Sequence, residues 1–162
     1  MDVTYLKMQG FTLIELIIVL ILMSILAVWT VNQWPGLTLN LPTQAQQLAN
    51  NIRYAQSLSM STDQRYRLVI LSSTTYQLTN SSGTAVIMAA GNTIVTLNSG
   101  ITFGTLTNLP NNLVAFDGQG IPYVNATTPG TALSANGTIP LSANGQTTSV
   151  IITPQTGRVS LQ

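Results

Sequence analysis

One carboxylate stands alone in a long apolar segment near the N-terminus of the chain. From Phe11 to Trp29 the only charged residue is Glu15. A helix of about 19 residues, at a rise of ~1.5 Å per residue, is just long enough to cross the hydrocarbon core of a membrane. A carboxylate in that environment costs roughly 2.5 kcal/mol or more, so Glu15 needs an oppositely charged partner or a specific function.

The residues that usually carry catalysis are scarce. The sequence has no cysteine and no histidine, which excludes disulfides, thiol catalysis, the most common catalytic base and the most common metal ligand. Asp63 and Asp117 are the only carboxylates after the apolar segment. Each lies in a predicted turn, where an aspartate accepts backbone hydrogen bonds. We therefore expect no enzyme activity, no metal site, no cofactor and no small-molecule substrate.

Three arginines are candidate contacts for nucleic acid. Arg65 and Arg67 alternate along a predicted strand and so share one face, which we expect to be solvated, while Asp63 could pair with either of them. Arg158 lies near the C-terminus. With five basic residues against four acidic ones in the whole sequence, the electrostatic attraction available for phosphate groups is small. Nucleic acid is therefore a disfavoured partner.

The N-terminal segment has three interpretations. A secretory signal would use Lys7 as its positive residue and be cut near Ala27, but its apolar core is usually ~7–15 residues long and needs no acid in its first turn. A plain single-span anchor would account for the length of the segment but not for Glu15. The third interpretation comes from a motif that begins at Gly10.

That motif resembles the N-termini of type IV pilins and of the pseudopilins of type II secretion. The resemblance rests on Gly10, Phe11, Thr12, Leu13, Ile14 and Glu15, followed by the unbroken apolar segment. It implies that a prepilin peptidase cuts between Gly10 and Phe11 on the cytoplasmic side and methylates the new amine of Phe11. It also implies that Glu15 pairs with the amine of Phe11 on a neighbouring subunit, because an intramembrane charge is best tolerated beside an opposite one.

The sequence divides into four predicted parts. Residues 1–10 form a leader peptide, whose Lys7 agrees with a cytoplasmic N-terminus, and residues 11–34 form a transmembrane and assembly helix. Residues 35–62 form a linker and an amphipathic helix, and residues 63–162 form a β-rich domain in the periplasm or at the fibre. Only 6% of the residues are charged, which suits an exported domain or one that packs among identical neighbours.

The predicted linker should kink or break the helix as the chain leaves the membrane, because it contains Pro35, Gly36 and Pro42. Thr43 then caps a second helix that runs to about Ser61. Its apolar positions recur every three or four residues: Ala45, Leu48, Ile52, Ala55 and Leu58. We expect this stripe to pack on the protein's own sheet rather than to bind a partner. The opposite, polar side carries Gln44, Gln47, Asn51 and Gln56.

From residue 66 onward the sequence changes to short β-rich runs separated by turn residues. The predicted strands are Tyr66–Leu71, Tyr76–Thr79, Ala85–Ala89, Thr93–Leu97, Ile101–Phe103, Leu113–Phe116, Thr138–Leu141, Ser149–Thr153 and Arg158–Leu161. Predicted turns include Asp117–Gly120, Asn136–Gly137 and Asn144–Gly145. Short strands after a long helix favour two packed antiparallel sheets. Residues 124–135 form a predicted long surface loop, either a contact loop or a solvated one.

The body of the chain resembles the H-type pseudopilins and the T-type minor pilins. The resemblance rests on residues 45–56 followed directly by the strand 66–70, and on residues 115–122. Residues 150–159 are similar to the minor pilins of the mannose-sensitive haemagglutinin (MSHA) pilus. Some T-type minor pilins bind DNA through paired arginines in a Gly-Arg-x-Arg motif, of which this sequence has only one arginine, Arg158.

Together these features predict an α+β structural subunit. A long, kinked N-terminal transmembrane helix continues into an amphipathic helix packed on two antiparallel β-sheets. The expected function is that of a minor pilin of a type IV pilus. The alternatives are an H-type pseudopilin of a type II secretion system and a DNA-binding minor pilin of natural transformation. The implied partners are other pilin or pseudopilin subunits, the prepilin peptidase, and the inner membrane with its assembly platform.

Overall fold

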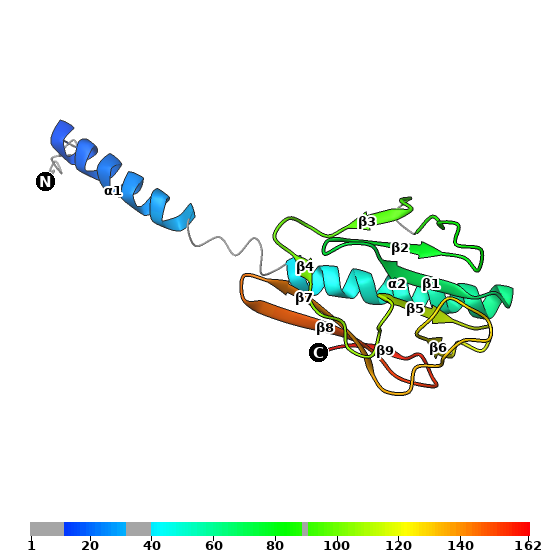
Figure 1. Ribbon diagram of the computed structural model, residues 1–162. Helices are drawn as coiled ribbons and strands as arrows, with labels where there is room; N and C mark the ends of the chain where they lie inside the picture. Colours follow the sequence, from blue (N-terminus) through cyan, green and yellow to red (C-terminus); the bar gives the residue numbers. More distant parts are fainter. Residues whose placement is uncertain (1–11, 32–39, 89–90) are drawn as a thin grey trace, which may run out of the picture. The chain divides into compact units, whose positions relative to one another are not determined.

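The chain divides into two compact units, residues 1–35 and 36–162. The computed structural model describes residues 12–31, 40–88 and 91–162. Helix α1 (Leu13–Val31) belongs to the first unit. Helix α2 (Asn40–Thr62) and the described strands belong to the second unit (Figure 1). The predicted leader peptide lies outside the described residues.

Helix α1 is apolar on every side. Its side chains from Leu13 to Leu26 are exposed, and the hydroxyl of Ser24 donates to the carbonyl oxygen of Leu20 at 2.7 Å within the helix. Among the residues that the structure describes, no helix has both the length and the hydropathy required to span a membrane. The predicted span of residues 11–34 begins and ends outside those residues, and the predicted kink falls mainly on the undescribed residues 32–39.

Helix α2 begins at Asn40 rather than after the predicted cap Thr43. Pro42 therefore lies in its first turn, where the missing N–H of proline breaks no helical hydrogen bond. The predicted apolar stripe is confirmed, and its fully buried members are Ala45, Leu48, Ile52 and Ala55. Gln44 and Asn51, predicted on the opposite, polar side, are also buried, because α2 packs against strands of both sheets.

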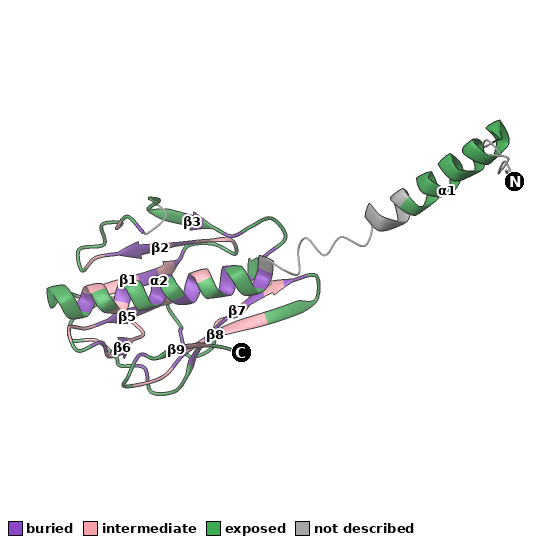
Figure 2. Cartoon of the chain, turned by 180° about the vertical axis from the view of Figure 1, so that it is seen from behind, coloured by how far each residue is buried: buried purple, intermediate pink, exposed green. Residues whose placement is uncertain are grey.

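Two antiparallel sheets form the rest of the second unit, in agreement with the predicted fold class (Figure 1). The first has the order β3-β2-β1-β5-β6, with bounds Ile94–Thr96, Thr75–Thr79, Tyr66–Ile70, Leu113–Phe116 and Pro122–Tyr123. The second has the order β4-β7-β8-β9, with bounds Thr102–Phe103, Gly137–Ala143, Gln146–Ile152 and Val159–Leu161. Figure 2 shows α2 lying along both sheets, with buried and exposed residues alternating around the helix.

Several predicted strand boundaries were wrong. Of the segment predicted as a strand at Ala85–Ala89, the described residues 85–88 belong to no strand, and Ala85 makes an isolated bridge with Thr79. Gly137, predicted in a turn, instead opens β7 and pairs with Ile152. Strand β6 was not predicted, because it contains only two residues, too few to show an alternating pattern. The predicted turn at residues 144–145 is confirmed, and both residues have the positive φ that a tight hairpin turn needs.

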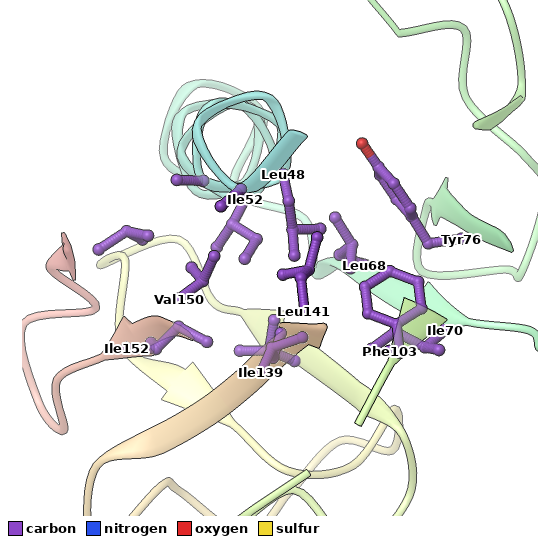
Figure 3. Close-up of a cluster of buried hydrophobic side chains, with 14 of the residues drawn as sticks. Leu48, Ile52, Leu68, Ile70, Tyr76, Phe103, Ile139, Leu141, Val150 and Ile152 are labelled. Carbon is purple, nitrogen blue, oxygen red and sulfur yellow. The ribbon is translucent and has the colours of Figure 1, made fainter. Parts of the chain in front are cut away.

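The hydrophobic core lies between α2 and the two sheets (Figure 3). Leu48 and Ile52 of α2 lie in one buried cluster with Leu68 of the first sheet and Ile139 of the second. Further core residues from the two sheets are Ile70, Tyr76, Phe103, Leu141, Val150 and Ile152. One helix thus supplies the apolar face that both sheets require.

Tyr76 brings a phenol hydroxyl into this core. The ring packs edge-on against Phe103, with ring centroids 6.0 Å apart, and the side chain is 1% exposed. The amide Nδ2 of Asn51 donates to the Tyr76 hydroxyl oxygen at 2.8 Å. Burial raises the pKa of Tyr76 to about 12, and the hydrogen bond from Asn51 opposes only part of that rise.

This pKa predicts an alkaline weakness of the fold. The pKa of Tyr76 is raised in the folded state, so its contribution to stability is complete below pH 10 and is lost as the pH rises to about 12. Between pH 9 and 11 the full-length chain should lose about 1.4 kcal/mol more unfolding free energy than the Tyr76→Phe variant. Urea unfolding at the two pH values measures this difference. Equal losses in both proteins would contradict it.

Candidate functional site

The first candidate site is the start of α1. The backbone N–H of Glu15 donates to the hydroxyl oxygen of Thr12 at 3.3 Å and to the carbonyl oxygen of Thr12 at 3.1 Å. Thr12 is therefore the N-cap of α1, and Glu15 occupies its first turn, where an acid is favoured by the helix dipole. Gly10 and Phe11 lie outside the described residues, so the predicted cleavage and methylation sites stay predictions.

The surroundings of Glu15 on α1 are apolar. Its side chain is exposed and, with Leu16, Val19 and Leu20, lines a shallow hollow on the helix surface. A helix that is apolar all round requires cover from other helices or from lipid. Glu15 is thus a single carboxylate on a helix surface that requires such cover.

The second candidate site is the set of arginines, which the structure does not assemble into one exposed cluster. The guanidinium of Arg65 lies 4.0 Å from the ring centroid of Tyr123 and donates to the carbonyl oxygen of Thr127. The Nε of Arg67 donates to the hydroxyl oxygen of Thr79 at 2.9 Å. Both side chains are half-buried rather than solvated as predicted, and β1 begins at residue 66, after Arg65.

Arg65 instead anchors the loop of residues 124–135. Besides its bond to Thr127, its guanidinium lies so close to Gly130 that a Cβ there would come within 2.5 Å of Nη1. Inside the loop the N–H of Thr131 donates to the side-chain oxygen of Asn125 at 2.9 Å. The N–H of Val124 donates to the Thr131 carbonyl oxygen at 3.0 Å. The loop therefore has a defined conformation that the sequence pattern did not indicate.

The two aspartates serve one turn. The side-chain oxygen of Asp117 accepts the N–H groups of Gln119 and Ile121 at 3.0 and 2.9 Å, as predicted for a turn aspartate. Asp63 lies against Gly118, where an added Cβ would collide with its carboxylate oxygen. Within the described residues no group of three acids, histidines or cysteines is placed to hold a metal ion.

Gln56 joins this turn to the opposite sheet. Its Nε2 donates to the carbonyl oxygen of Gly120 at 2.9 Å and to that of Thr156 at 3.0 Å. The absence of a side chain at Gly157 makes this approach possible, because a Cβ there would lie 2.5 Å from Gln56 Nε2 and 2.6 Å from the Gly120 oxygen. Three segments far apart in sequence, residues 45–56, 115–122 and 150–159, thus meet at one amide. The sequence pattern placed Gln56 on the polar side of α2 and did not indicate this role.

A family model for the type II transport protein GspH matches residues 44–157, which is more than half of the chain. The chain belongs to the GspH family. A second model, for the prokaryotic N-terminal methylation motif, matches residues 6–31. The GspH match includes residues 45–56 and 115–122 in full and residues 150–157 of the third segment that meets at Gln56. No curated protein matches the chain in sequence.

Solved structures share the GspH-type fold. The type IV minor pilin FimU of Pseudomonas aeruginosa superposes with a TM-score of 0.55 at 18% identity, covering 75% of this chain and 87% of FimU. The minor pseudopilin EpsH of the type 2 secretion system of Vibrio cholerae superposes with a TM-score of 0.52 at 12% identity, covering 76% of this chain and 96% of EpsH. The GspH-family chain is therefore a structural subunit of the pilin and pseudopilin type rather than an enzyme.

The Gln56 amide should stabilise the GspH domain measurably. In the Gln56→Leu variant the carbonyl groups of Gly120 and Thr156 lose their donor, which should lower the unfolding free energy by about 1–3 kcal/mol. Gln46→Leu is the matched control, because Gln46 lies on the same helix, is exposed and bonds only its neighbour Asn50 among the described contacts. Urea unfolding compares the two variants. A similar loss from both would remove the special role of Gln56.

The loop anchored by Arg65 gives a separate prediction. Arg65→Ala removes the stacking on Tyr123 and the bond to Thr127, so residues 124–135 should be cleaved several-fold faster in limited proteolysis. Arg158→Ala, at an exposed arginine, controls for the loss of charge. Mass spectrometry of the fragments locates the cuts. Unchanged cleavage of this loop in Arg65→Ala would show that Arg65 does not hold it.

Proposed function

We propose that the chain is a minor pilin of a type IV pilus. It enters the bacterial inner membrane as a single-pass protein, with its N-terminus in the cytoplasm and its C-terminal domain in the periplasm. The prepilin peptidase cuts between Gly10 and Phe11 and methylates the amine of Phe11. The assembly platform then moves the mature subunit into the pilus. The observation that carries this proposal is the lone carboxylate of Glu15 in the first turn of an exposed, apolar α1.

The proposed mechanism is polymerisation by helix bundling. Cleavage creates a positively charged amine at Phe11, four residues before Glu15. In a bundle of α1 helices, Glu15 of one subunit pairs with the Phe11 amine of its neighbour. Each charge offsets the desolvation of the other, while removal of either one leaves a buried charge unpaired. The same carboxylate that is costly in a lone membrane helix therefore favours the assembled state.

The apolar surface of α1 supplies the remaining driving force for the bundle. Within α1 the hydroxyl of Ser24 already donates to the Leu20 carbonyl oxygen, so it needs no hydrogen-bond acceptor from a neighbouring subunit. The exposed leucine, isoleucine and valine side chains can pack against those of other subunits in any rotational setting. Glu15 is the group on this surface that distinguishes one setting from another.

A pseudopilin of a type II secretion system is the second candidate. The description of the matching family model as a type II transport protein favours it, as does the fold likeness to a pseudopilin. The processing and bundling steps are the same in both proposals. They differ in the phenotype of a deletion strain, which would lose surface fibres in the first case and a secreted enzyme from the medium in the second.

Processing and assembly are tested together by intact mass and N-terminal sequencing of the membrane-extracted chain, with and without the prepilin peptidase. The wild-type chain should begin at Phe11 with one added methyl group only when the peptidase is present. Glu15→Gln should still be cut, but should enter fibres about tenfold less, because the Phe11 amine loses its partner.

Ser24→Ala is the matched control, since it also changes one polar side chain of α1 and should assemble normally. An N-terminus that stays uncut, or a cut near Ala27, would overturn the proposal. Normal fibre entry of Glu15→Gln would overturn the ion-pair mechanism alone.

A further inference from the structure

Within the described residues, strand β3 is an edge of the globular unit that no other segment covers. It is the first strand of the five-stranded sheet, pairs with β2 alone and is drawn as mainly exposed in Figure 2. The side chains of Ile94 and Thr96 are exposed, whereas Val95 faces inward. Unpaired edges are templates for another strand unless charge, proline or a covering segment protects them.

The other three edge strands are covered by described residues. At β6, the N–H of Leu133 donates to the Pro122 carbonyl oxygen at 2.8 Å, and the N–H of Phe103 in β4 donates to Ser73 at 2.7 Å. At β9, Nη2 of Arg53 donates to the Val159 carbonyl oxygen at 2.8 Å. The described residues offer no such contact to the outer side of β3.

The register of β3 shows which of its backbone groups face outward. Just beyond the ends of the two strands, the N–H of Leu97 donates to the carbonyl oxygen of Thr74, the residue before β2, at 2.8 Å. Bonded and non-bonded residue pairs alternate along an antiparallel ladder. Val95, opposite Tyr76, is therefore in a bonded pair with β2, while Ile94 and Thr96 are in non-bonded pairs. The N–H and C=O groups of Ile94 and Thr96 consequently point away from the sheet.

The chemistry of this edge suits an uncharged strand. No charged residue occurs between Leu68 and Phe116, so neither β3 nor its flanks carry the charges that usually protect an edge. Val95 also lines an open groove of about 750 Å³ beside α2, whose described lining has no charged side chain. Other lining residues are Met88, Pro42, Gln47 and Leu161.

We propose that β3 docks a second copy of this chain, strand against strand in antiparallel orientation. With Val95 opposite Val95 of the second copy, Ile94 of each copy exchanges both backbone hydrogen bonds with Thr96 of the other. Only Val95, on the two-fold axis, meets its own copy, so a charge at this position would face a like charge. The neutral edge avoids that repulsion. The joined strands extend the five-stranded sheet of each copy into the other.

The contact is weak on its own and specific in geometry. Three paired residues bury far less than the ~1,200 Å² of a stable interface. The fraction of copies paired through β3 therefore rises where other contacts already hold two copies close together, because their effective concentration is higher. The geometry itself does not depend on leader cleavage or on Glu15.

Cysteine trapping tests this geometry cleanly, because the chain has no cysteine of its own. The full-length chain is purified in detergent and oxidised mildly. Val95→Cys should form a covalent dimer at least tenfold faster than Thr96→Cys, since residues 95 face each other at about 4.5 Å between Cα atoms while residues 96 are diagonal, at more than ~7 Å. Random collision gives the opposite order, because Val95 is 8% exposed and Thr96 is on the surface.

A second pair of variants separates edge pairing from other association. In the Val95→Cys background, Thr96→Pro removes an outward N–H without breaking a bond to β2, and should slow dimer formation at least fivefold. Thr96→Val keeps that N–H and should leave the rate unchanged. Faster trapping at position 96, or no effect of Thr96→Pro, would overturn the proposal. Trapping of Val95→Cys only with a different subunit in cells would also overturn it.

Discussion

Both sheets of the globular unit depend on one helix for their core. Helix α2 buries Leu48 and Ile52 between strands of the two sheets. If one sheet lost its contacts with α2, the packing of the other sheet would also be disturbed. The same helix carries two polar side chains that find their partners in the sheets or their turns. Asn51 finds the Tyr76 hydroxyl and Gln56 finds two carbonyl groups. These bonds fix how α2 is rotated and how far it is shifted along the sheets.

The parts of this arrangement that depend on local pattern could be predicted. The apolar stripe of α2 follows from helical periodicity, and the hairpin at Asn144 and Gly145 follows from residues that accept a positive φ. Two antiparallel sheets follow from many short β-rich runs. Strand ends could not be predicted, because whether Ala85 joins a ladder depends on which strand lies beside it.

Polar partnerships were the main failure of sequence reasoning, for a physical reason. Gln56 and Arg65 are residues that usually face water, and nothing in their neighbours along the chain shows what lies opposite. Gln56 reaches turns 64 and 100 residues away, and Arg65 reaches a loop 62 residues away. Such contacts arise only when the whole fold is assembled. The glycines at 120 and 157 gave a hint, because both have positive φ and allow the close approach that Gln56 requires.

The scarcity of charge gives Glu15 its importance in the proposed fibre. A helix with an apolar surface on every side can pack in many rotations and shifts of nearly equal energy. One buried charge that requires an opposite charge removes most of these alternatives, as single buried polar groups fix register in other helix bundles. If many charges were present, several settings could each pair some of them. A single carboxylate four residues from a single amine allows only those helix rotations and shifts that bring the two groups together. In the proposed assembly this ion pair therefore sets the geometry, and the apolar contacts between helices strengthen it.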